Sequence, residues 1–305
     1  MHVFLTGASG FIGSYILKDL IAAGHTVRCL MRDTKGTLSV EDDSIERVKG
    51  DLTKPKSLTG LLRGCDAVIH LVGIIKEIPS RNVTFDALHF DATKNVVDEA
   101  VDSGITQFIQ MSANGARSEG ISGYQTSKWR AEEYVKKADF DRWTIFRPSV
   151  VFGAPSQGQP EFASQLISTL IRPFPVLPVF GDGRYEMQPV SVHDVSAGFV
   201  QALTVEASWK RSFCVAGQLK FTYSEILNIL AKGAGIEPKL QINQPVWMVR
   251  PVIHTVGKTG ALPITPDQFE MLLEGNTCDS SSFFEHFDLP NITFSPENLS
   301  YLSSY

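Results

Sequence analysis

Short apolar runs and amphipathic segments alternate through the first half of the chain. Runs of strand type occur at residues 2–5, 26–31, 45–52, 65–73, 105–111 and 143–153. Segments with apolar residues at helical spacing lie between them, at residues 14–24, 85–103 and 123–132. Strands that alternate with helices form parallel sheets with right-handed crossovers, so the pattern predicts an α/β fold with a doubly wound parallel sheet.

The pattern changes after Ala154, where prolines interrupt an otherwise apolar sequence. We therefore predict two domains, with the parallel sheet in residues 1–153 and a smaller lobe, expected to hold a substrate, in residues 154–305. Residues from about 185 to 216 are expected to return to the main sheet. The tail beyond Cys278 is polar and rich in serine, and we expect it to pack along the surface.

Two apolar stretches with few charges lie in the second half, at residues 162–180 and 246–262. The favoured interpretation is a lobe core with an apolar pocket lining, because apolar segments are most often buried. The alternative, less favoured, is a surface that lies on a bilayer or admits a quinone tail.

Composition and charge narrow the function classes. The chain has 305 residues and a formal net charge of −5, which argues against general nucleic-acid binding. The four cysteines are scattered and form no CxxC pair, so we expect reduced thiols in a cytoplasmic protein. The seven histidines show no metal-ligand spacing, so we expect no metal site.

A glycine-rich loop joins the first strand to the first helix. Gly7, Gly10 and Gly13 are three residues apart, within the run Thr6-Gly7-Ala8-Ser9-Gly10-Phe11-Ile12-Gly13. In a Rossmann fold these glycines make the tight turn, admit a pyrophosphate and allow close packing of the helix on the strand. The helix N-terminus then faces the anion with free N–H groups. The loop therefore predicts a dinucleotide site.

The end of the second strand bears on the choice of dinucleotide. Arg32 is the first residue past the apolar run, with Lys35 and Arg28 nearby. A guanidinium suits the 2′-phosphate of NADP, whereas an acid at this place would hold the ribose 2′-hydroxyl of NAD. We favour NADP, and NAD held by Asp33 stays open.

Two further strand ends are expected to face the cofactor. Asp51 would lie over the adenine edge, although it could equally cap a helix beginning near Lys54. Gly73 ends a fully apolar strand of central type and would let the backbone approach the dinucleotide. His70, inside that strand, is interpreted as a core histidine.

Tyr124 and Lys128 form the candidate catalytic pair. They lie four residues apart and so share one helical face. An ammonium at this spacing would lower the pKa of the phenol from about 10, and the phenol could then exchange a proton with a substrate. Lys128 could also bond the nicotinamide ribose, and Ser112 could polarise a carbonyl oxygen.

The glycine loop, Tyr124…Lys128 and Arg147-Pro148-Ser149 resemble the short-chain dehydrogenase/reductase superfamily, in its extended and atypical branches, along essentially the whole chain. Later stretches, such as residues 188–195 and 263–268, are similar to the NAD-dependent epimerase/dehydratase group that includes the nucleotide-binding accessory subunit of respiratory complex I. We expect these cofactor-binding residues: Gly7, Ala8, Ser9, Gly10, Phe11, Ile12, Gly13, Arg32, Asp51, Leu52, Leu71, Val72, Gly73, Tyr124, Lys128 and Pro148.

The resemblance has two departures. His89 stands where extended members carry an asparagine, and Ser112-Ala113-Asn114 replaces a run of serines. The resemblance thus implies either an NADP-dependent oxidoreductase or epimerase, or a non-catalytic NADPH-binding accessory or assembly factor in respiratory-chain or quinone metabolism. Expected partners are a small substrate or quinone-like ligand, with a homodimer through the helix of Tyr124, an accessory complex or a peripheral membrane contact as alternatives.

Overall fold

The computed structural model describes residues 1–155, 161–257 and 264–305. The chain divides into two compact units. The first comprises Met1–Pro148, His193–Val215 and Ser280–Pro290, and the second comprises Ser149–Val192, Ala216–Asp279 and Asn291–Tyr305. Each unit is thus assembled from three separate stretches of chain.

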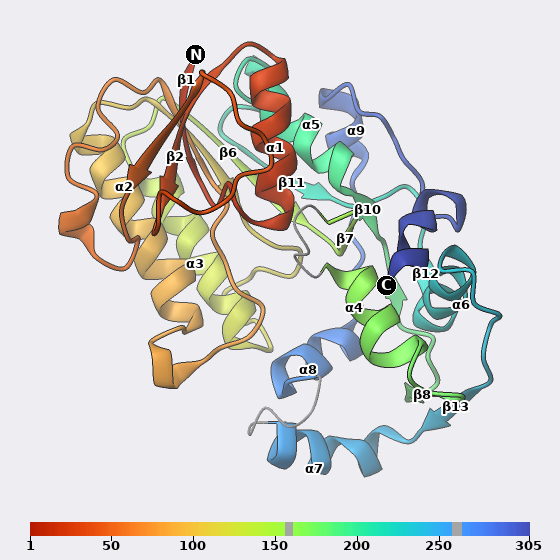
Figure 1. Ribbon diagram of the computed structural model, residues 1–305. Helices are drawn as coiled ribbons and strands as arrows, with labels where there is room; N and C mark the ends of the chain where they lie inside the picture. Colours follow the sequence, from red (N-terminus) through yellow and green to blue (C-terminus); the bar gives the residue numbers. More distant parts are fainter. Residues whose placement is uncertain (156–160, 258–263) are drawn as a thin grey trace. The chain divides into compact units, whose positions relative to one another are not determined.

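A parallel sheet of seven strands forms the centre of the first unit (Figure 1). Its spatial order is β11 (Arg211–Val215), β6 (Arg142–Pro148), β5 (Gln107–Met111), β4 (Ala67–His70), β1 (His2–Thr6), β2 (Thr26–Met31) and β3 (Ile45–Lys49). The chain begins in the middle, winds out to β3, returns to β4 and winds out the other way, which is the doubly wound order. The predicted fold class is confirmed.

Helices cover both faces of this sheet (Figure 1). One face carries α1 (Phe11–Ala22) and α5 (Val192–Gln201), which are joined by a 2.5 Å bond from Ser196 Oγ to Asp19 Oδ2. The other face carries α2 (Ala92–Asp102) and α3 (Gly123–Lys137). On that face Phe4, Val68 and Phe108 of the sheet pack in one buried cluster with Val96 of α2 and Val135 of α3.

The helix predicted over residues 85–103 begins with a π-helical turn. The turn spans Asp86–Asp91 and continues directly into α2. Gly104 follows with φ +75° and ends the helix as its sequence predicts. A π-helical turn displaces the side chains within it relative to a regular helix, and here it contains His89, which is buried.

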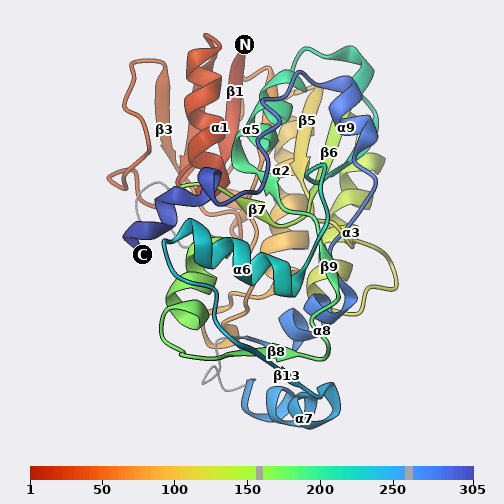
Figure 2. The same cartoon turned by 90° about the vertical axis from the view of Figure 1, so that its right-hand side faces the viewer.

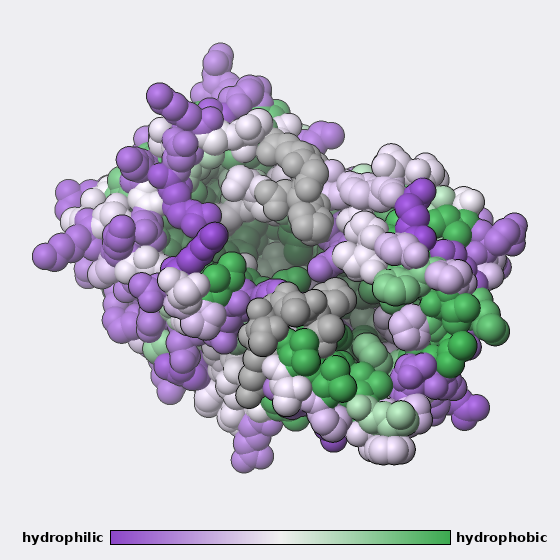
Figure 3. All heavy atoms as spheres, turned by 60° about the horizontal axis from the view of Figure 1, so that its bottom comes forward, coloured by the Kyte–Doolittle hydropathy of each residue, from purple (hydrophilic) through white to green (hydrophobic). Residues whose placement is uncertain are grey.

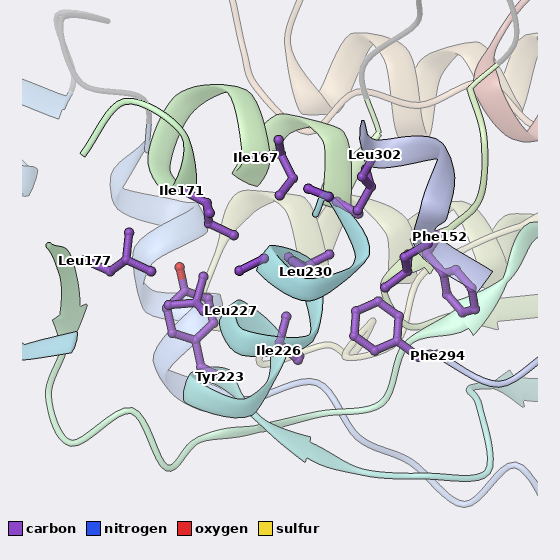
Figure 4. Packing of buried hydrophobic residues seen from close by; sticks show 14 of the residues in the cluster. Phe152, Ile167, Ile171, Leu177, Tyr223, Ile226, Leu227, Leu230, Phe294 and Leu302 are labelled. Atoms are coloured by element: carbon purple, nitrogen blue, oxygen red, sulfur yellow. The ribbon is translucent and has the colours of Figure 1, made fainter. Parts of the chain in front are cut away.

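The core of the second unit surrounds α6 (Tyr223–Gly233), whose Thr222–Glu225 capping box fixes its first turn. Figure 4 shows Leu227 and Leu230 of α6 on the side of Ile171 and Ile167, within one buried cluster that also includes Ile226. Ile167 and Ile171 lie in the π-helical segment Ile167–Ile171 that continues α4 (Phe162–Leu166). The apolar stretch 162–180 therefore contributes to the lobe core, as expected.

Short elements complete the described chain. Three strand pairs lie in the second unit: β7 (Val151–Phe152) with β10 (Val190–Ser191), β9 (Glu186–Met187) with β12 (Phe221–Thr222), and β8 (Leu177–Phe180) with β13 (Gln241–Gln244). The remaining helices are α7 (Val246–Val256), α8 (Pro266–Glu274) and α9 (Ser281–His286). Turns of 3₁₀ type lie at Pro55–Ser57, Pro79–Arg81, Glu206–Ser208 and Glu297–Ser304.

The C-terminal tail is not a surface segment, and that expectation is wrong. Phe283 of α9 is fully buried, and it packs with Phe287 and Phe146 in the first unit. Leu299 and Leu302 are fully buried in the second unit. The average composition of the tail is polar because serines lie between these apolar residues. The tail nevertheless contributes buried residues to the cores of both units.

The second apolar stretch also departs from its favoured interpretation. Within α7 Ile253 is buried, but Trp247 is 76% exposed and Met248 and Val252 are exposed. Figure 2 shows α7 beside the paired strands β8 and β13. Figure 3 shows hydrophobic side chains gathered on the face that carries α7. The described part of this stretch is therefore mainly an apolar surface, and residues 258–262 of it lie outside the described residues.

Three chemical features of the described residues bear on the remaining expectations. All four cysteines are free thiols. The described residues contain no cluster of histidine, cysteine and carboxylate side chains that could hold a metal ion. None of the described helices has the length and apolar character needed to cross a bilayer.

Candidate functional site

The glycine loop is shaped by close backbone approach. Gly7 has φ +81°, a conformation that favours glycine, and its carbonyl accepts a 3.0 Å hydrogen bond from Gly10 N. A Cβ at Gly13 would lie only 2.0 Å from Gly7 O, so any larger residue would push α1 away from the loop. The tight turn and the close helix packing that the glycine spacing predicts are therefore present in the structure.

The N-terminus of α1 fits a pyrophosphate. Gly10 occupies the N-cap position with extended backbone and no side-chain cap, and the first turn has no acidic residue. The first-turn N–H groups and the positive end of the helix dipole are thus directed past bare backbone. Leu71 and Val72 lie against Gly7, about where a Cβ on that glycine would touch them at 3.3 and 3.4 Å. Thr6–Gly13, Leu71 and Val72 can hold the dinucleotide.

Near the end of β2, Arg28 and Arg32 differ in whether the side chain is already hydrogen-bonded within the part of the chain that the structure describes. Arg28 donates to Glu46 Oε2 at 2.6 Å and to the carbonyls of Leu61 and Arg63, so it is engaged away from the strand end. Asp33 Oδ1 accepts from Lys35 N at 3.0 Å. Arg32 is exposed immediately after the strand. Of the three cations noted from the sequence, Arg28 is excluded from ribose recognition.

The side chain of Asp51 is hydrogen-bonded to the chain two residues later. Its Oδ1 accepts from the backbone N and the hydroxyl of Thr53, at 3.0 and 2.8 Å. Partial burial would raise the pKa of Asp51, but these bonds and the charge of Lys54 outweigh it and lower the pKa. Asp51 is not the helix cap, because Lys54 occupies the N-cap position of the turn Pro55–Ser57, without a side-chain cap bond. Leu52 is buried, and its carbonyl accepts from Asn95.

Lys128 is buried on α3, next to Gly73. Its Nζ donates to Met111 O at 3.2 Å, and a Cβ at Gly73 would lie 2.8 Å from this nitrogen. Burial lowers the pKa of Lys128 to about 8, and the charge of Glu132 opposes that shift. Gly73 therefore admits a cation to the carboxyl edge of the sheet, where open α/β sheets bind their ligands.

Tyr124 differs from its predicted state. Burial raises the pKa of Tyr124 to about 12, so the expected lowering by Lys128 is wrong. The physical reason lies in its surroundings. The phenol ring packs edge-on against Phe85 and His89, at centroid distances of 5.7 and 5.2 Å, while the ammonium of Lys128 is directed at Met111 O. The phenol is therefore protonated at neutral pH.

Ser112 is engaged in a buried ion-pair network that the sequence analysis missed. Its Oγ donates to Glu132 Oε1 at 2.5 Å. Arg147 holds the same carboxylate with two bonds, of 2.8 and 2.5 Å. A hydroxyl proton given to Glu132 cannot also be donated to a substrate carbonyl. The signal for this network was Glu132 itself, an acid four residues after Lys128 on the same helical face.

His89 forms a chain of hydrogen bonds behind Tyr124. Ile74 N donates to His89 Nε2 at 3.0 Å, and His89 Nδ1 lies 2.9 Å from Ser127 Oγ. Ser127 Oγ donates to Tyr124 O at 3.0 Å. Burial, together with the charge of Lys128, lowers the pKa of His89 to about 2, so the ring is neutral. This histidine, noted in the sequence only as a departure, positions the first turn of α3.

Pro148 lies at the end of β6, where its carbonyl accepts from Asn114 N at 2.8 Å. It is thus at the same edge of the sheet as the segment after β5. The structure brings Gly7, Leu71 and Val72 together, and it brings Gly73, Lys128 and His89 together. These contacts define a dinucleotide-binding α/β protein with a tyrosine and a lysine on the helix that follows the fifth strand.

The comparison with protein families agrees with this class. The model of the NAD dependent epimerase/dehydratase family matches residues 3–216, and the chain belongs to this family. It is 25% identical to the mitochondrial NADH-ubiquinone oxidoreductase 40 kDa subunit of Neurospora crassa, over 98% of this chain and 78% of that protein. It is 29% identical to the ceramide reductase of Caulobacter vibrioides, over 78% of this chain and 72% of that enzyme.

A third relative matches this chain over a smaller share of its own length. The chain is 30% identical, over 73% of its length, to the mitochondrial NADH dehydrogenase [ubiquinone] 1 alpha subcomplex subunit 9 of Arabidopsis thaliana, and it spans 56% of that protein. Among solved structures, the UDP-glucuronic acid 4-epimerase of Bacillus cereus with NAD gives a TM-score of 0.75 at 18% identity, over 100% of this chain and 96% of that chain. MoeE5 in complex with UDP-glucose and NAD gives a TM-score of 0.75 at 18% identity, over 100% and 98%. These structures share the fold.

Proposed function

We propose that this protein is an NADP-dependent oxidoreductase that reduces a carbonyl group, with Tyr124 as proton donor and Lys128 as the group that holds the nicotinamide ribose. The observation that carries the proposal is the buried Lys128 ammonium beside Gly73. A buried cation beside a bare glycine, on the same helical face as a tyrosine, supports ribose binding next to a proton donor. The bound dinucleotide supplies the hydride.

The protonated phenol of Tyr124 is compatible with the proton-donor role that reduction requires. Since its pKa is raised to about 12, the phenol holds its proton at neutral pH and can give it to a carbonyl oxygen. Ser112 cannot assist as a donor while its proton is bonded to Glu132. Tyr124 therefore carries the acid role without a serine donor.

The substrate class that we propose is a lipid-like or quinone-like carbonyl compound. One relative is a ceramide reductase, and another is named a ketoreductase of a farnesylated quinoline oxide, at 26% identity over 56% of this chain. A sugar-nucleotide substrate is less suitable, because Arg172 is the only lysine or arginine between Ala154 and Gly183 and a diphosphate calls for cations.

The test compares Tyr124→Phe with Tyr134→Phe. Tyr134 lies on the same helix, but its hydroxyl donates to Asp98 at 2.6 Å. We expect Tyr124→Phe to lower NADPH-dependent reduction of a short-chain ubiquinone or a long-chain keto lipid by about 10²- to 10⁴-fold, with NADPH affinity unchanged. The ultraviolet phenolate signal lost in Tyr124→Phe should titrate above pH 10. Equal losses of reduction in the two variants would contradict the acid role of Tyr124.

The second candidate is a non-catalytic NADPH-binding accessory protein. Two observations favour it: Ser112 is bonded to Glu132, and α7 exposes Trp247, Met248 and Val252, an apolar face of the kind that binds partners. If wild-type protein binds NADPH without consuming it, this function replaces the first. Trp247→Glu should then abolish co-migration with a respiratory complex while NADPH binding persists.

A further inference from the structure

A row of buried polar side chains crosses the middle of the parallel sheet. Thr6 of β1 is paired with His70 of β4, and His70 is paired with Gln110 of β5. Their exposed fractions are 0%, 0% and 1%. Paired residues on neighbouring strands project to the same face, so the three side chains lie side by side inside the sheet's packing layer.

Two polar side-chain atoms of this row lack a hydrogen-bond partner among the described residues. Thr6 Oγ1 lies 2.7 Å from His70 Nδ1, and Gln110 Nε2 donates to Met111 O at 3.3 Å. His70 Nε2 and Gln110 Oε1 are buried, and neither has a hydrogen-bond partner among the described residues. Buried polar atoms are almost always paired, with protein or with ordered water. Two such atoms on directly paired residues therefore indicate one shared ligand.

Lys128 lies next to Gln110, at the end of the row on β5. Its Nζ donates to Met111 O at 3.2 Å, the oxygen that also accepts from Gln110 Nε2. Phe108 precedes Gln110 by two residues on the same face of β5, and it packs in one cluster with Val135 of α3. The row therefore faces the helix that carries Lys128. The charge of Lys128 also contributes to lowering the pKa of His70, to about 3, after the larger effect of burial.

We propose that one internal water bridges His70 Nε2 and Gln110 Oε1 and accepts a hydrogen bond from Lys128 Nζ. At the water itself the donors and acceptors balance. We assign the His70 proton to Nδ1, facing Thr6 Oγ1, which makes both His70 Nε2 and Gln110 Oε1 acceptors. The water donates one proton to each and offers a lone pair to the ammonium. Buried waters commonly make about three such bonds.

The inference deepens the proposed function, on which its consequence for catalysis rests, because it makes His70 and Gln110 positioning residues for Lys128. A water that donates to two acceptors is oriented to stabilise a neighbouring cation. Among the described residues, Glu132 of α3 and the neutral His89 of the π-helical turn also lie near Lys128, and Tyr124 lies one turn earlier on the same helix. Removing an anchor of the water should therefore make Lys128 lose its proton at lower pH.

The first test is a high-resolution crystal structure of the wild-type protein. We expect an ordered water within hydrogen-bond distance of His70 Nε2 and Gln110 Oε1. A direct bond between the two side chains, or a His70 ring turned to another partner, would overturn the proposal. So would a site without electron density.

The second test compares Gln110→Met with Gln107→Met. Gln107 lies on the same strand, is also fully buried and also has an unpaired Oε1 among the described residues. Its Nε2 donates to Ala202 O at 3.0 Å, and its odd spacing from Gln110 puts it on the opposite face. It therefore matches Gln110 in chemistry and burial but not in place.

The readout is the ionisation of Lys128, followed by NMR of protein with ¹³C-labelled lysine and assigned with Lys128→Arg. We expect Gln110→Met to shift the ionisation down by about one pH unit, a tenfold change in its constant, and Gln107→Met to leave it unchanged. His70→Phe is a second variant with the same expected direction. Equal shifts in the two glutamine variants, or no shift in Gln110→Met and His70→Phe, would overturn the proposal. The readout needs no turnover, so it stays informative if the protein proves not to be an enzyme.

Discussion

The state of each candidate side chain depends on which of its polar atoms are already bonded within the protein. Arg28 and Ser112 look available in the sequence, but Glu46 and Glu132 hold them. Lys128 is the opposite case, because one carbonyl, Met111 O, accepts from its ammonium among the bonds described, and an ammonium has three N–H donors. At the scale of the residue, the capacity for chemistry remains at Lys128 and Tyr124.

Arg32 carries a residue-scale prediction about cofactor choice. Arg32→Ala should raise the Kd for NADP by about ten- to a hundredfold, because a hydrogen bond to a charged group is worth about 1.5–3 kcal/mol. The Kd for NAD should stay within about twofold. Fluorescence titration with both dinucleotides measures this, with Arg28→Gln as control because Arg28 is held by Glu46. A similar loss of NAD affinity in Arg32→Ala would show that Arg32 does not recognise a 2′-phosphate.

At the scale of the element, α3 combines the two candidate catalytic residues with the group that fixes the helix to the sheet. Tyr124 and Lys128 lie in its first half, and one turn later Glu132 is held by Arg147 of β6. Breaking a buried ion pair by removing one partner costs about 3–5 kcal/mol. The network therefore anchors the helix that presents the site, in addition to engaging Ser112.

The helix α7 carries the element-scale prediction. Ile253→Ala should lower the free energy of unfolding by about 2–5 kcal/mol, because Ile253 is buried and its loss leaves a cavity. Val252→Ala, one residue earlier on the exposed face, should change stability by about 0.5 kcal/mol or less. Urea denaturation of the two variants measures the difference. Equal destabilisation would mean that the apolar face of α7 is covered in solution.

At the scale of the whole molecule, the two units are interleaved along the chain. Residues 193–215 complete the main sheet with β11, and residues 280–290 return to the first unit after a long excursion in the second. The last residues then contribute Leu299 and Leu302 to the second unit. Neither unit is a continuous piece of sequence, so both depend on the C-terminal tail.

A truncation tests this dependence. A chain that ends at Asp279 loses the buried Phe283 and Phe287 from one unit and the buried Leu299 and Leu302 from the other. Loss of each buried phenylalanine costs about 3–5 kcal/mol, against a typical total stability of about 5–15 kcal/mol. We expect no cooperative thermal transition by circular dichroism. Removal of residues 303–305 alone should leave the transition in place, and a cooperative melt of the long truncation would contradict the argument.

The sequence by itself determined the features that depend on local pattern. The alternation of strands and helices predicted the doubly wound sheet. The glycine spacing predicted the loop, because Gly13 packs against the carbonyl of Gly7, only six residues earlier in the chain. The positions of Tyr124 and Lys128 on one helical face, and the end of α2 at Gly104, also follow from short-range geometry. The family resemblance rested on the same local motifs.

The tertiary structure alone decided what depends on partners distant in the chain. The raised pKa of Tyr124 arises from aromatic neighbours that include His89, 35 positions earlier in the sequence. The engagement of Ser112 needs a carboxylate from α3 and a guanidinium from β6. The exposed face of α7 and the buried phenylalanines of the tail reverse what composition favoured, because burial depends on which elements pack together. Sequence pattern therefore indicated the candidate site, and long-range contacts determined the state of its side chains.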